Sequence, residues 1–464
     1  MKNFHFRPGI GLAFTALYIF TLGLVIVAAV VTNYLVMALG IVLSCLQYYL
    51  HGLFKRSYRT VKNYPFDRYF KDIFSFVPVK VAQLFTTSPR IAAELTKRER
   101  VLFVKRSKNL ETVVVEDNLL NKYDPGFEFL RTHTAFMPLS PAELRVEVGT
   151  AQCLHPYSLN VYNFGGLDHG ILPKKSTHAL SQAANISSCA VKSGQKGLTP
   201  ELVRGGGDIV WQIDFGDMAL RNPDRSFNQG MIKAIAGKPY IKMIEVRLHT
   251  NHDDDQKKPS NEAAIFELVN KLQGWSGGKP VGIHLLNPSS EMIDVLVRST
   301  TAAKINLDFI SIEESWGPNR LLYKAIEQRF FEAVFTAKAL LLSYDLKTKV
   351  IATGVILTEY DILRLCALGA DACFSSASTM VGNGLLHQKL ISLSQPSSIR
   401  FANFHRNTLE ATRELMQRCG YEKLSEADPA DFYRRVNAFE IVSLREIFGQ
   451  KGQERAMLSD VHLN

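Results

Sequence analysis

The sequence predicts an α/β protein: a TIM-type (β/α)8 barrel preceded by two transmembrane helices. Between residues 158 and 375, short apolar runs alternate with amphipathic helical segments. This alternation is typical of a parallel sheet covered by helices. Near the N-terminus, residues 9–50 contain no charged side chain, which indicates membrane-spanning segments.

Eight apolar runs are predicted to be strands, and eight strands that alternate with helices favour a closed barrel. The alternative is a doubly wound open sheet, but no GxGxxG follows the first strand. The predicted strands are Ser158–Phe164, Ser188–Ser193, Asp208–Ile213, Lys242–Leu248, Pro280–Leu286, Asn306–Ile312, Lys349–Thr353 and Ala372–Ser375. The predicted helices include Ala92–Lys105, Asn261–Leu272, Ser290–Ala303, Asn319–Leu342 and Asn407–Cys419.

The last two predicted strands enclose a further helix. The strand Val350–Ala352 ends at Gly354, and Thr358 with Asp361 three positions later is a capping-box variant that predicts a helix start. Strand, helix and strand within about thirty residues form a βαβ unit. In (β/α)8 barrels, the loops after the last two strands frequently bind phosphate, so these loops are the predicted phosphate cradle.

The uncharged N-terminal stretch is long enough for two spans of about 20 residues each, and we place them at residues 10–31 and 34–50. A secretory signal peptide would explain only the first run, and a core hairpin would rarely lack charge over such a length. Basic residues flank both ends, which predicts a hairpin in the inner (cytoplasmic) membrane with the barrel facing the cytoplasm. These residues are Lys2, Arg7, Lys55, Arg56, Arg59 and Lys62.

Three regions follow from these assignments: a transmembrane hairpin at 1–51, a membrane-proximal helical or linker region at 52–150, and the barrel with C-terminal helices at 151–464. The formal net charge is +10, but most basic residues are spread along the chain, so no nucleic-acid partner is predicted. The six cysteines lack CxxC spacing, which predicts reduced, buried thiols and no metal site built from them.

Two glycine-rich stretches, Gly194–Pro200 and Gly205–Ile213, resemble the FMN-binding barrel domain of the glutamate synthase family. More narrowly, they are similar to its stand-alone branch with an N-terminal membrane hairpin. Further matching segments cover nearly the whole chain: Asn63–Pro65, His155–Ser158, Asn163–Gly165, Lys242–Val246, Gly277–Gly282, Ala367–Asp371 and Asn403–His405. The resemblance implies FMN-dependent oxidoreductase chemistry on CH–NH2 groups, making glutamate from 2-oxoglutarate and glutamine-derived ammonia, with electrons relayed by an iron–sulfur cluster.

The resemblance also implies cofactor contacts at eight positions, and this sequence departs from the family around them. A phosphate dianion needs amide donors and a fixed cation. The family's arginine in the eighth-strand loop is Ala377 here, and its fifth-strand lysine is His284. Losing both would weaken FMN binding by roughly 10²–10⁴. The implied contacts are Phe164, Gly165, Gln212, His284, Ala352, Gly354, Ser375 and Ser376.

Three other loops also differ from the family pattern. Gln195 and Lys196 replace an acidic residue and a glycine, Asn251–Asp255 replaces Gly-Ala-Lys-Pro-Gly, and Glu313–Pro318 replaces Gly-Gly-Thr-Gly. The cluster region, Gly382–Ser398, holds no cysteine. Because iron–sulfur clusters need several thiolates, no cluster is expected.

Remaining polar motifs each have a structural alternative. His249 and His252 with Asp253–Asp255 could bind zinc, but no fourth ligand can be assigned, so a solvated loop is favoured. Gly205–Gly207 could be a phosphate loop, but a turn into a strand is favoured, because no helix begins after it. Glu245 is either a base or, more commonly, a barrel salt-bridge partner.

Two hypotheses about function result. The first is an FMN oxidoreductase of the glutamate synthase type with altered electron delivery and substrate, indicated by the retained Gly165, Gly354 and Gly205 run. Under it, His284 is either a proton donor in the pocket or a core residue. The second is a catalytically inactive member acting as a membrane-associated scaffold or regulator, which the loop departures favour. The substrate, electron donor, partner protein and oligomeric state stay open.

Overall fold

The computed structural model describes residues 97–110, 112–132, 144–165, 174–194, 197–215, 217–248, 262–314, 320–376 and 397–449. The chain divides into two compact units, Met1–Leu84 and Phe85–Asn464, and all described residues belong to the second. The predicted hairpin at residues 10–50 lies outside the described residues. Within the described part of the chain, no helix combines the length and apolar character needed to cross a bilayer.

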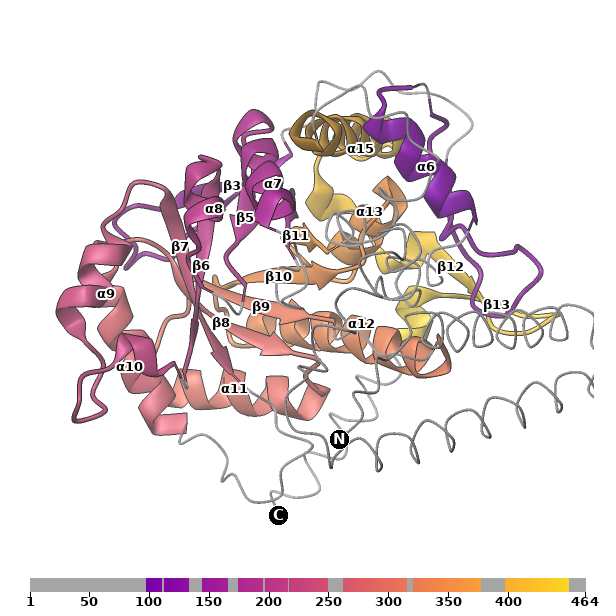
Figure 1. Ribbon diagram of the computed structural model, residues 1–464. Coiled ribbons are helices and arrows are strands. Elements are labelled where there is room, and N and C mark those ends of the chain that lie inside the picture. The colour runs from indigo at the N-terminus through magenta and orange to yellow at the C-terminus, as the bar shows by residue number, and fades with distance from the viewer. Residues whose placement is uncertain are drawn as a thin grey trace, which may run out of the picture. The chain divides into compact units, whose positions relative to one another are not determined.

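Eight parallel strands close into a barrel in the order β10-β11-β4-β5-β6-β7-β8-β9, which confirms the predicted barrel (Figure 1). Each predicted strand overlaps one barrel strand, so the alternation of apolar runs located all eight. The barrel strands are β4 (Tyr162–Phe164), β5 (Ala190–Lys192), β6 (Asp208–Asp214), β7 (Ile241–Leu248), β8 (Val281–Leu286), β9 (Phe309–Glu313), β10 (Lys349–Gly354) and β11 (Ala372–Ser375).

Helices follow the strands and cover the outside of the barrel (Figure 1). The predicted capping box is present, since the Thr358 hydroxyl accepts a hydrogen bond from the Asp361 amide and the Asp361 carboxylate accepts one from the Thr358 amide. The covering helices are α7 (Lys174–Ile186), α8 (Pro200–Arg204), α9 (Gln229–Ala236), α10 (Glu262–Trp275), α11 (Ser290–Ala302), α12 (Arg320–Ser343), α13 (Glu359–Ala367) and α15 (Ser397–Cys419). The described residues also form the short 3-10 helices η2 (Met218–Leu220), η4 (Leu424–Glu426) and η5 (Pro429–Asp431).

The first predicted strand is divided in two at Val161. Its first half, β3 (Tyr157–Asn160), pairs antiparallel with β2 (Arg145–Val148), and its second half is β4 of the barrel. Val148 and Leu159 from this hairpin share a buried cluster with side chains from the barrel strands. The hairpin therefore closes the amino-terminal end of the barrel with an apolar layer.

Segments far apart in the sequence meet beside α13. Helix α6 (Lys97–Ser107) lies along α15 (Figure 1), with the rings of Phe103 and Phe404 4.5 Å apart. Arg106 Nη2 lies 2.7 Å from a Glu359 carboxylate oxygen, and neither side chain is exposed. This ion pair fixes α6 to the start of α13, since a buried pair is held only where its geometry is good.

A small antiparallel sheet joins the two ends of the described chain. Strand β1 (Glu128–Leu130) pairs with β12 (Phe432–Arg435), which pairs with β13 (Ile441–Ser443). Glu128 accepts hydrogen bonds from Arg364 (2.6 Å) and Arg434 (2.6 Å). Burial alone would raise the pKa of Glu128, but these two arginines outweigh it and lower that pKa. The carboxylate thereby links the sheet to α13.

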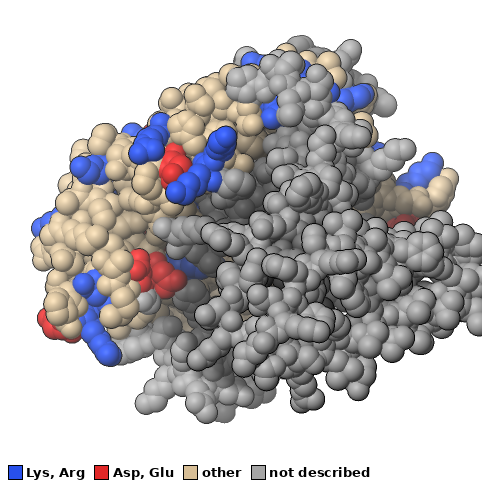
Figure 2. All heavy atoms as spheres, viewed as in Figure 1, with Lys and Arg blue, Asp and Glu red and all other residues tan. Residues whose placement is uncertain are grey.

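The surface of the described region carries its basic side chains at scattered positions. Figure 2 shows lysine and arginine side chains distributed over the described part of one face and interspersed with acidic and uncharged residues. An electrostatic footprint for nucleic acid would gather them in a stripe or patch, and the visible part of this face has no such stripe.

Candidate functional site

The barrel interior changes from apolar to polar along the strands. Side chains at alternate positions face the interior. Near the amino-terminal end these include Met243 on β7 and Phe309 on β9, both in the interior apolar cluster. Two residues further along stand Glu245 and Ser311, both buried. The polar half lies toward the carboxyl ends of the strands, where (β/α)8 enzymes carry their active sites.

Lys192 on β5 lies at the centre of this polar half. Its Nζ lies 3.2 Å from Glu245 Oε1, donates to Ser311 Oγ at 2.6 Å, and lies 3.5 Å from His284 Nδ1. The same ammonium lies 5.0 Å from the centroid of the Phe374 ring. The lysine side chain is only 2% exposed, so the ammonium has lost its hydration water. The protein contacts compensate for that loss.

His284 on β8 connects both sides of the cluster. Its Nδ1 lies 3.1 Å from Gln212 Nε2 and 3.4 Å from Glu245 Oε1. Its Nε2 forms a 3.1 Å ion pair with Glu313 Oε2. Since Nδ1 also faces the Lys192 ammonium, a proton is held most favourably at Nε2, toward Glu313.

The charges of this cluster shift each other's pKa values. Burial alone would raise the pKa of Glu245, but Lys192 and His284 outweigh it and lower that pKa to about 2. The pKa of Glu313 is also lowered to about 2, because the hydrogen bond and charge of His284 outweigh its burial. Burial and Lys192 lower the pKa of His284, but Glu245 and Glu313 outweigh both and raise it. The two carboxylates therefore favour the protonated form of the imidazole.

We name Lys192, Gln212, Glu245, His284, Ser311 and Glu313 the interior cluster. Sequence reasoning singled out Gln212 and His284, and it weighed Glu245 as a salt-bridge partner, which the structure confirms. Lys192 and Ser311 were not singled out, although each is a polar residue within an apolar run. That signal marks a candidate, but only the closed barrel shows that β5, β6, β7, β8 and β9 bring the side chains of the interior cluster together.

The other predicted contact residues fall into two groups. Gly165, Gly354, Ser375 and Ser376 lie at neighbouring strand ends: the Gly165 amide donates to the Ser375 carbonyl at 2.9 Å, and the Ser376 amide to the Gly354 carbonyl at 2.8 Å. Phe164 and Ala352 are buried in the hydrophobic core shared by strands and helices. The ring of Phe164 lies 5.5 Å from that of His405 on α15, so it packs against a helix.

The loops after β10 and β11 were the predicted phosphate cradle. The loop after β11 lies outside the described residues from position 377 onward, and the amide groups of the loop after β10 already have acceptors within the protein. Val355 N donates to Glu314 Oε2 at 3.4 Å, and Ile356 N donates to the Gly354 carbonyl at 3.0 Å. Leu357 N and the next amide both donate to the carboxylate of the α13 cap at 3.0 Å. A phosphate binds through free amides and a cation. The described residues of this loop therefore do not fit the phosphate of FMN.

Residues 249–255, which were weighed as a zinc site and predicted to be a solvated loop, lie outside the described residues. Within the described ranges, no group of three or more His, Cys, Asp or Glu side chains is arranged to hold a metal ion. The five described cysteines, Cys153, Cys189, Cys366, Cys373 and Cys419, are free thiols.

Comparison with known proteins gives one similar curated sequence. The chain is 25% identical over 320 residues to the glutamate synthase large subunit-like protein YerD of Bacillus subtilis (strain 168), covering 60% of this chain and 60% of that protein. No protein-family model matches the chain. The alignment agrees with the resemblance found in the sequence but spans less than two thirds of the relative.

Solved structures with a similar arrangement include mandelate oxidase with benzoyl-formic acid, at 13% identity and a TM-score of 0.45, covering 67% of this chain and 87% of that one. A mandelate oxidase mutant with benzaldehyde is 14% identical with a TM-score of 0.45, covering 77% of this chain and 97% of that one. Likeness at this level carries no argument about function. The barrel itself is established by the strand order given above.

Proposed function

We propose that this chain is a glutamate synthase-like oxidoreductase that acts on a small amino or oxo acid at the carboxyl end of its barrel. One observation carries the proposal: the interior cluster places an imidazole and an ammonium between buried carboxylates at that end of the strands. The similarity to the curated relative supports the glutamate synthase-like class.

A buried cluster of charges is not needed to stabilise a protein that acts only as a scaffold. Burying an ion costs several kcal/mol even after relaxation, and apolar residues of similar volume often stabilise a core as well or better. The amino-terminal half of this barrel is filled in that apolar way. Strongly perturbed pKa values gathered at the end where barrels carry active sites therefore favour a reaction site.

Each residue of the cluster has a definable part in such chemistry. His284 is the candidate general acid, since its neighbours raise its pKa above the ordinary value. Glu245 and Glu313 favour its protonated form, and Lys192 fixes the position of Glu245. FMN is the cofactor that the resemblance implies, and the loop after β10 does not fit its phosphate.

The proposal is tested by glutamate formation. The full chain, purified in detergent, is incubated with 2-oxoglutarate and ammonium ions in the presence of dithionite-reduced riboflavin or, separately, reduced FMN. We expect glutamate to form with at least one flavin, and His284→Gln to lower the rate by about 10²–10⁴ as a lost general acid would. Absence of glutamate with both flavins would refute the proposal.

A second candidate function is a catalytically inactive scaffold or regulator. It is favoured by the engaged amides of the loop after β10. This candidate predicts that the purified protein is colourless, gives no calorimetric heat with either flavin and forms no glutamate. Stoichiometric bound flavin in the purified protein would exclude it.

We also propose that residues 10–50 tether the barrel to the cytoplasmic membrane with the barrel in the cytoplasm. The uncharged stretch of about two spans and its basic flanks support this. Reporter fusions at the C-terminus test it: a reporter active only in the cytoplasm is expected, and one active only outside it would refute the topology.

A further inference from the structure

Glu314 follows strand β9 and directs its carboxylate toward the end of β10. Its amide donates to the Thr353 carbonyl at 2.9 Å, and its Oε2 accepts from Val355 N at 3.4 Å. A Cβ atom built on Gly354 would lie 2.8 Å from the same Oε2. The carboxylate thus occupies the space that the missing side chain of Gly354 leaves at this strand end.

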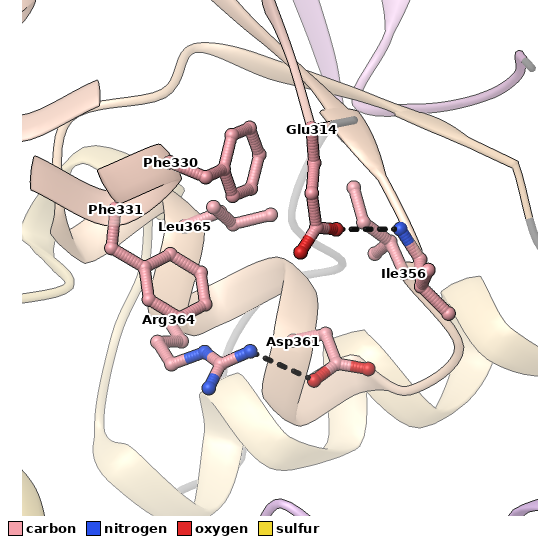
Figure 3. Close-up of a pocket in the computed structure, with 8 residues that line it drawn as sticks. Glu314, Phe330, Phe331, Ile356, Asp361, Arg364 and Leu365 are labelled. Atoms are coloured by element: carbon pink, nitrogen blue, oxygen red, sulfur yellow. Dashed lines mark hydrogen bonds and ion pairs between the residues drawn. The ribbon is translucent and has the colours of Figure 1, made fainter. Parts of the chain in front are cut away.

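The carboxylate also faces a small hollow of about 10 Å3, room for about one water molecule, between the strand ends and helices α12 and α13. Figure 3 shows Glu314 pointing into it, with Phe330 on one side and Ile356 on the other. Asp361 lines the same hollow and accepts the two amides that follow Ile356. Two carboxylates therefore take three of the four amides at positions 355–358.

These are the amides that a phosphate at this edge of a (β/α)8 barrel would use. A phosphate dianion placed there would lose those donors and would lie next to a carboxylate, and like charges within a few ångströms disfavour binding. A glutamine oxygen would accept the same Val355 amide, so Glu314→Gln removes the charge and keeps this hydrogen bond. Introducing an opposing group is a common way to reject one ligand in favour of another.

We propose that Glu314 is a specificity-determining residue that excludes phosphorylated ligands, so that the barrel prefers riboflavin, which lacks the phosphate, to FMN. This inference rests on the proposed flavin-dependent function. The family has a glycine-rich loop after the sixth barrel strand, and this chain has acidic residues there. The inference gives that replacement a role, whereas the sequence alone indicated only that the family's loop was missing.

The experiment compares the dissociation constants of riboflavin and FMN by calorimetry for the full chain in detergent and for Glu314→Gln. We expect wild type to bind FMN no more tightly than riboflavin. In Glu314→Gln we expect FMN binding to tighten roughly 10–100-fold, because the like charge beside the phosphate is removed, with riboflavin binding changed less than about twofold. Glu267→Gln, which removes an exposed carboxylate on α10, is the matched control and should change neither constant.

Three outcomes would overturn the role of Glu314. In the first, the wild type binds FMN more than tenfold tighter than riboflavin; in the second, Glu314→Gln changes the dissociation constants of both flavins equally. In the third, neither flavin binds to the wild type or to the variant. Should Glu314→Gln unfold, Glu314→Ala provides the same comparison. The assay of glutamate formation separates the two proposals, since glutamate formed by a wild type that prefers FMN refutes the role of Glu314 and leaves the proposed function standing.

Discussion

Replacing Lys192 by methionine removes the central cation of the interior cluster while keeping a similar side-chain volume. The ammonium lies 3.2 Å from Glu245, and Coulomb's law at an effective dielectric constant of about 20 gives roughly 5 kcal/mol for that separation. Removing one partner of a buried pair leaves the other charge uncompensated, typically at about 3–5 kcal/mol. We therefore expect Lys192→Met to lower the free energy of unfolding by about that amount.

A double-mutant cycle isolates the pair. Glu245→Gln alone should cost about as much as Lys192→Met, and the double variant should lose less than the sum by roughly 2–5 kcal/mol, because no unpaired charge remains. The measurement is urea unfolding of the full chain in detergent, followed by tryptophan fluorescence, with the buried Trp211 on β6 as a probe of the core.

An exposed pair provides the matched control. Lys271 and Glu267 on α10 are closer together, at 2.5 Å, but their side chains are 47% and 64% exposed. Lys271→Met should change stability by no more than about 0.5 kcal/mol, because water screens the pair. If Lys192→Met and Glu245→Gln each cost under about 1 kcal/mol and add without coupling, the reasoning that burial strengthens this pair is refuted.

Three further predictions concern other parts of the fold. The two buried histidines should change the free energy of unfolding in opposite directions with pH. The pKa of His284 is raised, so its contribution is present below about pH 6.5 and is lost as pH rises. Burial lowers the pKa of His405 to about 4, so its contribution is present above about pH 6.5 and is lost as pH falls toward 4. Urea unfolding of His284→Gln and His405→Gln across pH 4–9 should each remove one of these slopes, and unchanged slopes would contradict the assignment. Gly282→Ala places a Cβ against the backbone of β9 and should cost more than about 2 kcal/mol, whereas Gly274→Ala in α10 meets nothing within 4 Å and should stabilise by about 0.5–1 kcal/mol; equal melting temperatures would contradict this. Arg106→Met leaves its buried carboxylate partner on α13 uncompensated and should cost about 3–5 kcal/mol, and a loss under 1 kcal/mol in urea unfolding would show that the pair is not needed.

The sequence by itself determined the barrel. The eight strands and most helices were located from local periodicity, and the capping box at Thr358 was recognised because its hydrogen bonds join residues only three positions apart. Such features depend on neighbouring residues and on which side chains are apolar, so they can be recognised without tertiary information. The break at Val161 was missed because both halves of that run are apolar enough to be strand.

Only the tertiary structure decided what the barrel's carboxyl end contains. Lys192 and Glu245 are 53 positions apart, and Glu314 is 41 positions from the amide it accepts. The loss of a lysine at His284 suggested a missing cation, but β5 supplies one 3.5 Å away. Whether a polar side chain faces the interior depends on strand register around the closed barrel, and a chain read in one dimension does not contain the pairing that sets it.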